Sequence, residues 1–216
     1  MILKSSIIVT MIIFSLRSFA GYDSKVSGFY LNHFAQPKDL KDNACKQFLK
    51  TVYRGGQPVF DGTDTWINKI KSSKIKMVFD LREETKHAAL ERDTLLKNGI
   101  GYVKLPLRTS GNTQPENFEV EVAYPAINKF QSPIRTKTLM NSVEATIYVL
   151  NLMEAIIDKQ TDESIYLHCQ RGEDRTGLMV ALLRNCGSFK SEFLDYGGVM
   201  YKPLQKLMDD VNKLRK

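Results

Sequence analysis

A ten-residue segment that begins at His168 carries the residues best suited to chemistry. It reads His168-Cys169-Gln170-Arg171-Gly172-Glu173-Asp174-Arg175-Thr176-Gly177, between apolar runs at 164–167 and 178–183. These residues can form a cradle for phosphate, which consists of a cysteine at the end of a strand, a short loop, and an arginine that opens a helix. The loop N–H groups converge on the anion, and the helix N-terminus adds positive potential. The same field favours the thiolate form of Cys169, which is the nucleophilic form.

The segment resembles the Cys-x5-Arg loop of the protein-tyrosine-phosphatase superfamily, whose dual-specificity branch has His-Cys-x-x-Gly-x-x-Arg-Thr-Gly. The resemblance implies that Cys169 is the nucleophile and passes through a phosphocysteine intermediate. It implies that Arg175 grips two phosphate oxygens, most strongly in the transition state. Thr176 would bond the sulfur, His168 would orient the loop from behind, and Gly172 would allow a backbone that a side chain obstructs. No metal or cofactor is expected, because the loop and its arginine supply the positive charge.

Two further segments extend the resemblance beyond the loop. Residues 53–58, Tyr-Arg-Gly-Gly-Gln-Pro, are similar to the Tyr-Arg-Ser-Gly-Gln-Pro opening of small bacterial dual-specificity phosphatases. Residues 79–84 are similar to their Asp-Leu-Arg segment. The resemblance therefore covers roughly residues 50 to 200 of one domain. The alternative to a phosphatase loop is a strand, turn and helix around a buried structural cysteine. That alternative explains poorly why two arginines and two acids share one tight turn.

The general acid is the part of the family pattern that is missing from its usual place. Family members carry an aspartate between the third strand and the long helix, whereas residues 106–135 contain none. Asp174 is the leading substitute, because it has the place of the aspartate in the Asp-Arg-Thr ending of myotubularin and Sac phosphoinositide phosphatases. Asp80 and Glu116 are the alternatives, and Asp174 could instead point outward and brace the loop. The leaving group needs a proton from one of these carboxyl groups.

The segment 80–87 resembles the Asp-Leu-Arg-x-Glu segment, followed closely by histidine, of exported tyrosine-phosphatase-like phytases. This resemblance implies an anionic small-molecule substrate, an inositol polyphosphate such as inositol hexakisphosphate. Residues of the cradle and basic residues near strand ends would bind its phosphates: Gln170, Arg171, Gly172, Glu173, Arg175, Arg54, Arg82, Lys86, Lys104 and Arg108. A dual-specificity or protein tyrosine phosphatase is the alternative enzyme. A pseudophosphatase that binds phosphate without chemistry is the alternative from another class.

The elements that position the loop alternate along the chain. Strand-like segments lie at 51–53, 76–81, 102–105 and 164–167, and helix-like segments at 61–71, 83–98 and 143–157. A helix follows Arg175, and two C-terminal helices are interrupted near Gly197-Gly198 and Pro203. Residues 106–135 carry four prolines without clear periodicity, so no element is assigned there. The order predicts an α/β domain with a central, mostly parallel twisted sheet flanked by helices. Ligands of such sheets bind at the carboxyl ends of strands, where Cys169 falls.

The N-terminus has the features of a secretory signal. Lys4 precedes an apolar core at 7–14, and Ser18-Phe19-Ala20 is a small-x-small cleavage site. We therefore expect a signal peptide over 1–20 and a mature bacterial domain over 21–216, exported to the periplasm or secreted. The apolar run is too short to span a bilayer, so no stable membrane insertion is expected after cleavage. Arg17, between core and cleavage site, leaves a membrane-tethered form open.

The rest of the composition sets limits. The mature length fits one domain, which we expect to be a monomer. The net charge of +7 is spread along the chain and no nucleic-acid-reading motif is present, so no nucleic-acid partner is expected. Cys45 and Cys186 could pair as a disulfide away from Cys169, or both could be small buried apolar residues.

Overall fold

The computed structural model describes residues 49–58, 65–83, 87–128, 130–158, 163–183 and 198–215. The expected signal peptide, Lys86, and the pair Cys45 and Cys186 lie outside these ranges. Among the helices within them, none combines the length and apolar character that crossing a bilayer requires.

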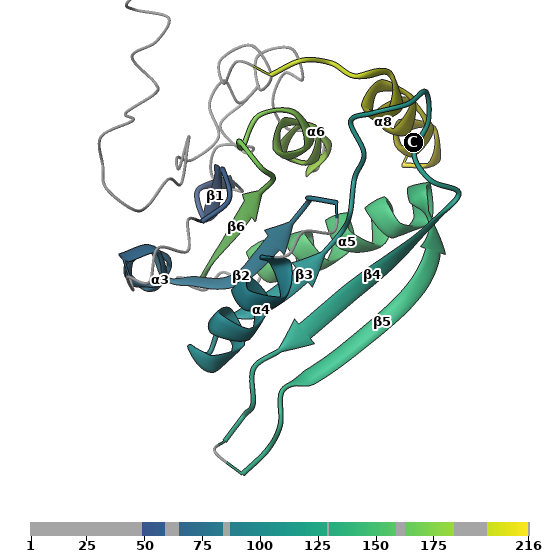
Figure 1. Ribbon diagram of the computed structural model, residues 1–216. Helices are drawn as coiled ribbons and strands as arrows, with labels where there is room; N and C mark the ends of the chain where they lie inside the picture. The colour runs from purple at the N-terminus through teal and green to yellow at the C-terminus, as the bar shows by residue number, and fades with distance from the viewer. Residues whose placement is uncertain are drawn as a thin grey trace, which may run out of the picture.

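A six-stranded sheet in the order β1-β6-β2-β3-β4-β5 forms the centre of the domain (Figure 1). The four strands on one side run parallel: β1 (Val52–Gly55), β6 (Ser164–His168), β2 (Ile75–Asp80) and β3 (Gly101–Lys104). β4 (Asn117–Tyr124) and β5 (Ile134–Asn141) continue the sheet as an antiparallel hairpin. The prediction of an α/β domain with a mostly parallel sheet is confirmed.

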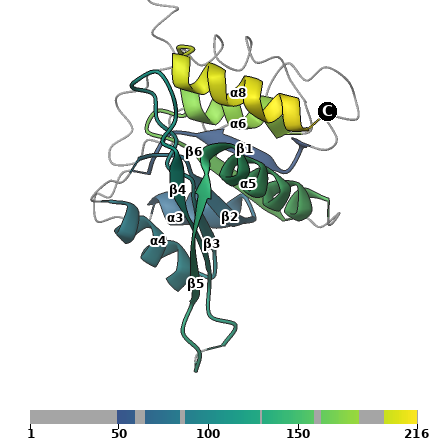
Figure 2. The same cartoon turned by 90° about the vertical axis from the view of Figure 1, so that its right-hand side faces the viewer.

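Helices cover both faces of the sheet (Figure 2). α5 (Ser142–Ile157), α6 (Asp174–Leu182) and α8 (Lys202–Leu214) pack on one core, and α3 (Thr65–Ser72) and α4 (Ala88–Lys97) on the other. Successive side chains of β2 point to opposite faces of the sheet, so that Met77 and Phe79 pack in the first core and Val78 packs in the second. Burial on both faces explains why the parallel strands are apolar runs.

Two helix boundaries differ from the sequence-based expectation. α4 begins at Ala88 rather than at residue 83. Pro203 stands in the first turn of α8 and so starts that helix instead of interrupting it, because its missing N–H is not needed there. Gly99 closes α4 with a φ of 76°, as expected for a glycine past a helix end. The second expected C-terminal helix, before Gly198, lies outside the described residues.

The β4–β5 hairpin was not predicted from the sequence. The expectation that residues 106–135 hold no regular element is wrong, because β4 spans 117–124. A signal was present, since Phe118, Val120 and Val122 alternate with polar residues and are buried against α5. β5 had no such signal, because seven of its eight residues are exposed. The hairpin extends beyond the rest of the domain (Figure 1).

Candidate active site

Cys169 lies at the carboxyl end of β6, between the ends of β1 and β2. Its side chain is buried, and the backbone N–H of Gly172 donates a hydrogen bond to Sγ over 3.3 Å. α6 begins five residues later at Asp174, which brings the N-terminus of that helix to the same loop. The loop thus directs an N–H group at the sulfur beside a helix N-terminus, as an anion-binding nest requires.

Gly172 is required by both its backbone conformation and its surroundings. Its φ of 81° is in the left-handed region, which side chains rarely adopt. A Cβ atom on this residue would lie 2.3 Å from the carbonyl carbon of Gly55 and 2.7 Å from the nitrogen of Gly56. The loop therefore packs directly on the backbone that follows β1.

Arg54 holds the loop from the buried side. Its side chain is fully buried, and NH2 donates to the carbonyl oxygens of Gly172 at 2.5 Å and Glu173 at 3.3 Å. Carbonyl groups drawn toward Arg54 leave the N–H groups of the loop free to turn toward an anion. The expectation that Arg54 binds substrate phosphate is not supported by this position; Arg54 shapes the cradle.

Arg175 and Thr176 open α6 beside the sulfur. The Arg175 side chain is largely buried, and NH1 donates to the carbonyl oxygen of Leu107 over 3.3 Å. Leu107 belongs to the connection between β3 and β4, so that connection reaches the cradle. Thr176 is fully buried, and within the described residues its hydroxyl makes no hydrogen bond. The expected Thr176 bond to sulfur is therefore not formed in this structure.

Arg82 belongs to an ion-pair network beneath the loop. Its Nε and NH2 donate to the two carboxylate oxygens of Asp80 over 2.7 and 2.8 Å, and NH2 also donates to Glu91. NH1 donates to Gln57 Oε1 over 2.9 Å. Burial acts to lower the pKa of Arg82, but Glu91 and Asp80 outweigh it and raise that pKa. The expectation that Arg82 binds substrate phosphate is not supported by this position, because its guanidinium is buried and occupied by these partners.

Asp80 is held ionised at the centre of the network. Burial alone would raise its pKa, but His168, Arg82 and Lys104 together lower it. The Tyr102 hydroxyl donates to the carboxylate over 2.8 Å, and Lys104 Nζ lies 3.6 Å from it. A fully buried, ionised carboxylate does not donate a proton to a leaving group. Asp80 is therefore excluded as the general acid, and Lys104 is committed to this pair.

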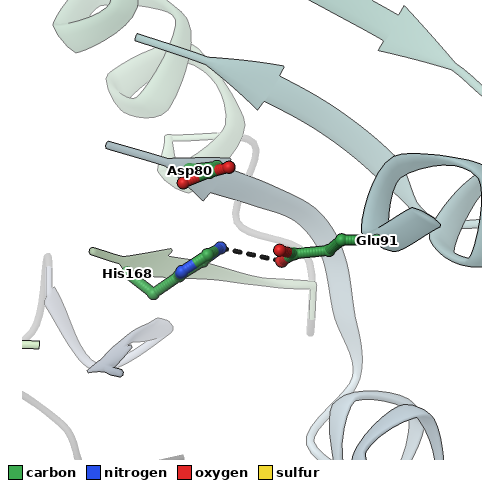
Figure 3. Close-up of side chains that lie close together, drawn as sticks. All are labelled: Asp80, Glu91 and His168. Atoms are coloured by element: carbon green, nitrogen blue, oxygen red, sulfur yellow. Dashed lines mark ion pairs between the residues drawn. The ribbon is translucent and has the colours of Figure 1, made fainter. Parts of the chain in front are cut away.

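The His168 side chain is fully buried at the end of β6, directly before Cys169, and its ring points toward Glu91 of α4 (Figure 3). Nε2 lies 2.8 Å from Oε1 of Glu91, and Nδ1 lies 3.2 Å from the carbonyl oxygen of Cys169. The ring stacks on Tyr166 with centroids 5.4 Å apart. Glu91 was not predicted from the sequence. Its signal is an acid on the apolar face of α4, at helical spacing from buried Ala88 and Leu95.

Asp80, Glu91 and His168 present ligand atoms within 4.8 Å of one another, which is close enough for a metal ion. The Arg82 guanidinium already binds both carboxylates, and His168 faces Glu91. A cation here would add positive charge beside an arginine that cannot lose its own. The three side chains fit an ion-pair network and do not fit a metal site.

The geometry of a cysteine in an N–H nest, followed by an arginine on a helix, agrees with comparison against known proteins. A model of the tyrosine phosphatase family matches residues 48–189. The chain belongs to this family. It is a cysteine-based phosphatase, a hydrolase of a class that works without a metal. No curated protein is significantly similar to it in sequence.

A solved structure shares the fold of this phosphatase. A protein from Shewanella putrefaciens CN-32 described as a phosphatase is 13% identical, with a TM-score of 0.54 over 89% of this chain and 95% of that one. Pseudomonas aeruginosa TpbA is 15% identical, with a TM-score of 0.47 over 85% of this chain and 94% of that one.

Two acids within the loop differ in their surroundings. Asp174 is half-buried, and its Oδ1 accepts a hydrogen bond from the backbone N–H of Val199 over 2.5 Å. Burial raises the pKa of Glu173, Asp174 raises it further, and Arg171 and Arg54 oppose the rise. Asp174 therefore braces the loop against the segment before α8, whereas Glu173 is the acid whose protonated form its surroundings favour.

The remaining candidates lie at the surface around the loop. Gln170 and Arg171 have exposed side chains, and the Gln170 carbonyl oxygen accepts from the Gln57 N–H over 3.2 Å. Arg108, next to Leu107, is half exposed, and its Nε lies 3.3 Å from Glu83 Oε1. Glu116 is exposed directly before β4. Of the basic residues predicted to bind substrate, the structure thus leaves Arg171 and Arg108 exposed near the cradle.

Proposed function

We propose that this phosphatase cleaves phosphate monoesters in two steps at Cys169. The sulfur attacks phosphorus and displaces the ester oxygen, which takes a proton; water then attacks the phosphocysteine and releases inorganic phosphate and the thiolate. The bond from the Gly172 N–H to Sγ is the observation that carries this proposal. Arg175 would exchange the Leu107 carbonyl for two phosphate oxygens, an interaction that strengthens as charge develops in the transition state.

For the proton donor we propose Asp174, because it has the place of the aspartate in the Asp-Arg-Thr ending that the loop resembles; Glu173 is the second candidate. Asp174 must give up its bond from Val199 to donate a proton, whereas the raised pKa of Glu173 favours the protonated form that an acid needs. Both variants, Asp174→Asn and Glu173→Gln, should be assayed with p-nitrophenyl phosphate and with an alkyl phosphate. Loss of the acid should slow the alkyl ester far more, because p-nitrophenolate leaves without a proton. Equal slowing of both esters by one variant removes that residue from the role.

We infer the substrate class from the basic residues around the cradle, few of which remain available within the part of the chain that the structure describes. We propose an aryl phosphate ester of the phosphotyrosine type, since Arg54, Arg82 and Lys104 are buried with other partners. The sequence-based hypothesis of an inositol polyphosphate is the second candidate. It is favoured by the exposed guanidinium groups of Arg171 and Arg108, which could bind phosphates that are not cleaved.

Comparing kcat/KM for a phosphotyrosine peptide and for inositol hexakisphosphate tests this choice. We expect the peptide to be preferred, and the double variant Arg171→Ala, Arg108→Ala to change that preference little. Lys97→Ala, which removes an exposed cation at the end of α4, is the matched control. A preference for inositol hexakisphosphate that the double variant abolishes and the control retains would establish the second candidate. Failure to hydrolyse any ester would favour a pseudophosphatase.

We further propose that the enzyme works outside the bacterial cytoplasm as a monomer. The charged start, apolar core and small-x-small site over residues 1–20 support export. Mass spectrometry of the protein recovered from the periplasm or medium should give Gly21 as the first residue. An intact N-terminus in the cytoplasmic fraction would contradict export.

Light scattering of the purified protein gives its mass in solution and tests the monomer. A mass of twice one chain would contradict it.

A further inference from the structure

The turn of the β4–β5 hairpin presents two apolar side chains to solvent. Ile127 is 84% exposed and Phe130 is 87% exposed, more than any other large apolar side chain in the part of the chain that the structure describes. The hairpin extends beyond the rest of the domain, and both residues lie between its two strands (Figure 1). Isolated apolar residues are ordinary on a protein surface, but two on a projecting turn form an apolar tip.

This tip lies at the opposite end of the sheet from the cysteine loop. β4 is antiparallel to β3, and Ala123 near the end of β4 pairs with Tyr102 near the start of β3. The turn is therefore at the amino ends of the parallel strands, whereas Cys169 follows the carboxyl end of β6. The tip and the helices α6 and α8 are at opposite ends of the molecule in Figures 1 and 2. A partner bound at the tip leaves the cysteine loop accessible.

Lysines gather on the surface next to the tip. One hollow joins the end of α4, at Lys97 and Gly99, to the hairpin turn. A second hollow shares Gly99 and reaches the start of β2, where Lys71, Lys74 and Lys76 line it. All four lysines are exposed, and together they form a basic patch that adjoins the tip.

Acids beside the basic patch do not cancel its charge. Glu163 lines the second hollow, and its Oε1 lies 3.9 Å from Lys76 Nζ. Asp93 lines the first hollow and pairs with Arg135 over 2.8 Å. The two hollows are thus lined by five basic residues and two acids. Residues 122–143, which include the turn, contain no acid.

We propose that the apolar tip and the basic patch form one binding surface for a lipid bilayer with anionic headgroups. Apolar and aromatic side chains on a projecting turn enter the interfacial region of a bilayer, and lysines beside them attract anionic headgroups. Nucleic acid would pair with the lysines, but it offers no apolar phase for Ile127. The contact is peripheral, and it holds the cysteine loop away from the membrane. The inference goes beyond the proposed reaction, because it uses no residue of that loop.

Flotation with lipid vesicles tests the surface. The full chain is centrifuged through a density gradient with vesicles of phosphatidylglycerol and phosphatidylcholine, or of phosphatidylcholine alone. We expect flotation with the anionic vesicles, and much less with the neutral ones or in about 1 M salt, which screens the charges. Wild-type protein that stays at the bottom with anionic vesicles would overturn the proposal.

The apolar half of the surface is tested by Ile127→Ser, Phe130→Ser. This double variant should bind anionic vesicles at least about tenfold more weakly, because the buried apolar area is lost. Leu90→Ser, Leu214→Ser is the matched control, since it removes two leucines that are at least half exposed and lie outside the surface. The control should float as wild type does. Any binding by the N-terminal apolar run is common to all variants, so equal flotation of the two variants would contradict a role of the tip.

The basic half is tested by Lys71→Gln, Lys97→Gln. Each lysine near an anionic surface contributes roughly fivefold, so this variant should bind anionic vesicles about 10- to 30-fold more weakly. Lys206→Gln, Lys213→Gln removes two exposed lysines of α8 at the opposite end and should bind as wild type does. Equal loss in both variants would show that net charge, and not this patch, drives binding, and would overturn the proposal.

Fluorescence of Phe130→Trp locates the tip directly. The one native tryptophan, Trp66, is buried, so a change in emission reports the new indole. With anionic vesicles we expect emission at shorter wavelength and quenching by brominated lipid. Unshifted emission would overturn the proposal, as would a dimer in light scattering that Ile127→Ser, Phe130→Ser dissociates, because a second copy would then cover the tip. Vesicle binding by a chain that hydrolyses no ester would refute the proposed function alone.

Discussion

Two ion pairs in this phosphatase have the same length and opposite surroundings. Arg82 Nε lies 2.7 Å from Asp80 Oδ1 with both side chains at most 1% exposed, and Lys137 Nζ lies 2.7 Å from Glu119 Oε1 with both more than half exposed. The first lies beneath the cysteine loop and the second on the β4–β5 hairpin. Water screens the exposed pair, whereas removing one partner of the buried pair leaves an uncompensated charge. Burial, and not distance, decides which pair the domain depends on.

A second comparison is between the cysteine loop and the buried ion-pair network beneath it. Cys169 and Arg175 belong to the loop that we propose binds substrate, whereas Asp80, Arg82 and Glu91 form the ion-pair network beneath that loop. Substitutions of the two loop residues should remove activity with little effect on stability. Substitutions in the network should lower both activity and stability. Substitutions in the hairpin pair should do neither.

Cys169→Ser should have the largest effect on activity. We expect phosphate release to fall by more than about 10⁴-fold, because the hydroxyl is a far weaker nucleophile under the same field. The thermal midpoint should stay close to that of wild type, since serine fits the same volume. Steady-state kinetics with p-nitrophenyl phosphate check the loss of activity, and thermal unfolding checks the unchanged midpoint. Retained activity would move the nucleophile elsewhere.

Arg82→Met should destabilise the domain most. It leaves two buried carboxylates without their shared partner, which costs about 3–5 kcal/mol of unfolding free energy. Lys137→Met is the matched control, and the urea midpoint of that variant should not change measurably. Equal effects of the two substitutions on the urea midpoint would show that burial does not distinguish the pairs.

Gly172→Ala should act on stability and activity together. Its new Cβ meets the backbone of Gly55, which adds about 1–3 kcal/mol of overpacking to the strain of its φ of 81°. Gly111→Ala separates the two causes, because Gly111 has a φ of 83° with nothing within 4 Å of the added atom. That variant should lose only about 1–2 kcal/mol from strain and keep its activity. Urea unfolding and kinetics of both variants decide this.

The smallest effect is expected in the pH dependence of stability. The pKa of folded Asp80 is below its ordinary value of 3.8, so its contribution is complete above that value and declines as the pH falls below it. Wild-type stability should therefore drop as the pH falls from about 4 toward about 2, and Asp80→Asn should flatten that drop. Glu119→Gln, in the exposed pair, should retain the wild-type slope in urea titrations. An unchanged slope in Asp80→Asn would contradict the assignment.

Much of the parallel half of the fold could be predicted from local patterns. The apolar runs of β1, β2, β3 and β6, the amphipathic α5, and the loop from Cys169 to Arg175 all have short-range signals. β5 could not be predicted, because it lies at the edge of the sheet, where its side chains stay exposed and show no apolar alternation. The start of α4 at Ala88 could not be predicted either. The conformation of the preceding residues 81–83 depends on contacts with residues far away in the sequence, such as Gln57 and His168.

The sequence by itself determined the chemistry, because Cys169 and Arg175 are six residues apart and a single turn between strand and helix must bring them together. Only the tertiary structure decided the roles of the other charged residues. Arg54 and Arg82 have the same residue type as Arg171, but the first two are buried on loop carbonyls and carboxylates and the third is exposed. Glu91 enters the site from a helix 77 positions before His168 in the sequence. Burial and partners are properties of packing between distant segments, and for a charged group they decide whether it binds substrate or holds the loop.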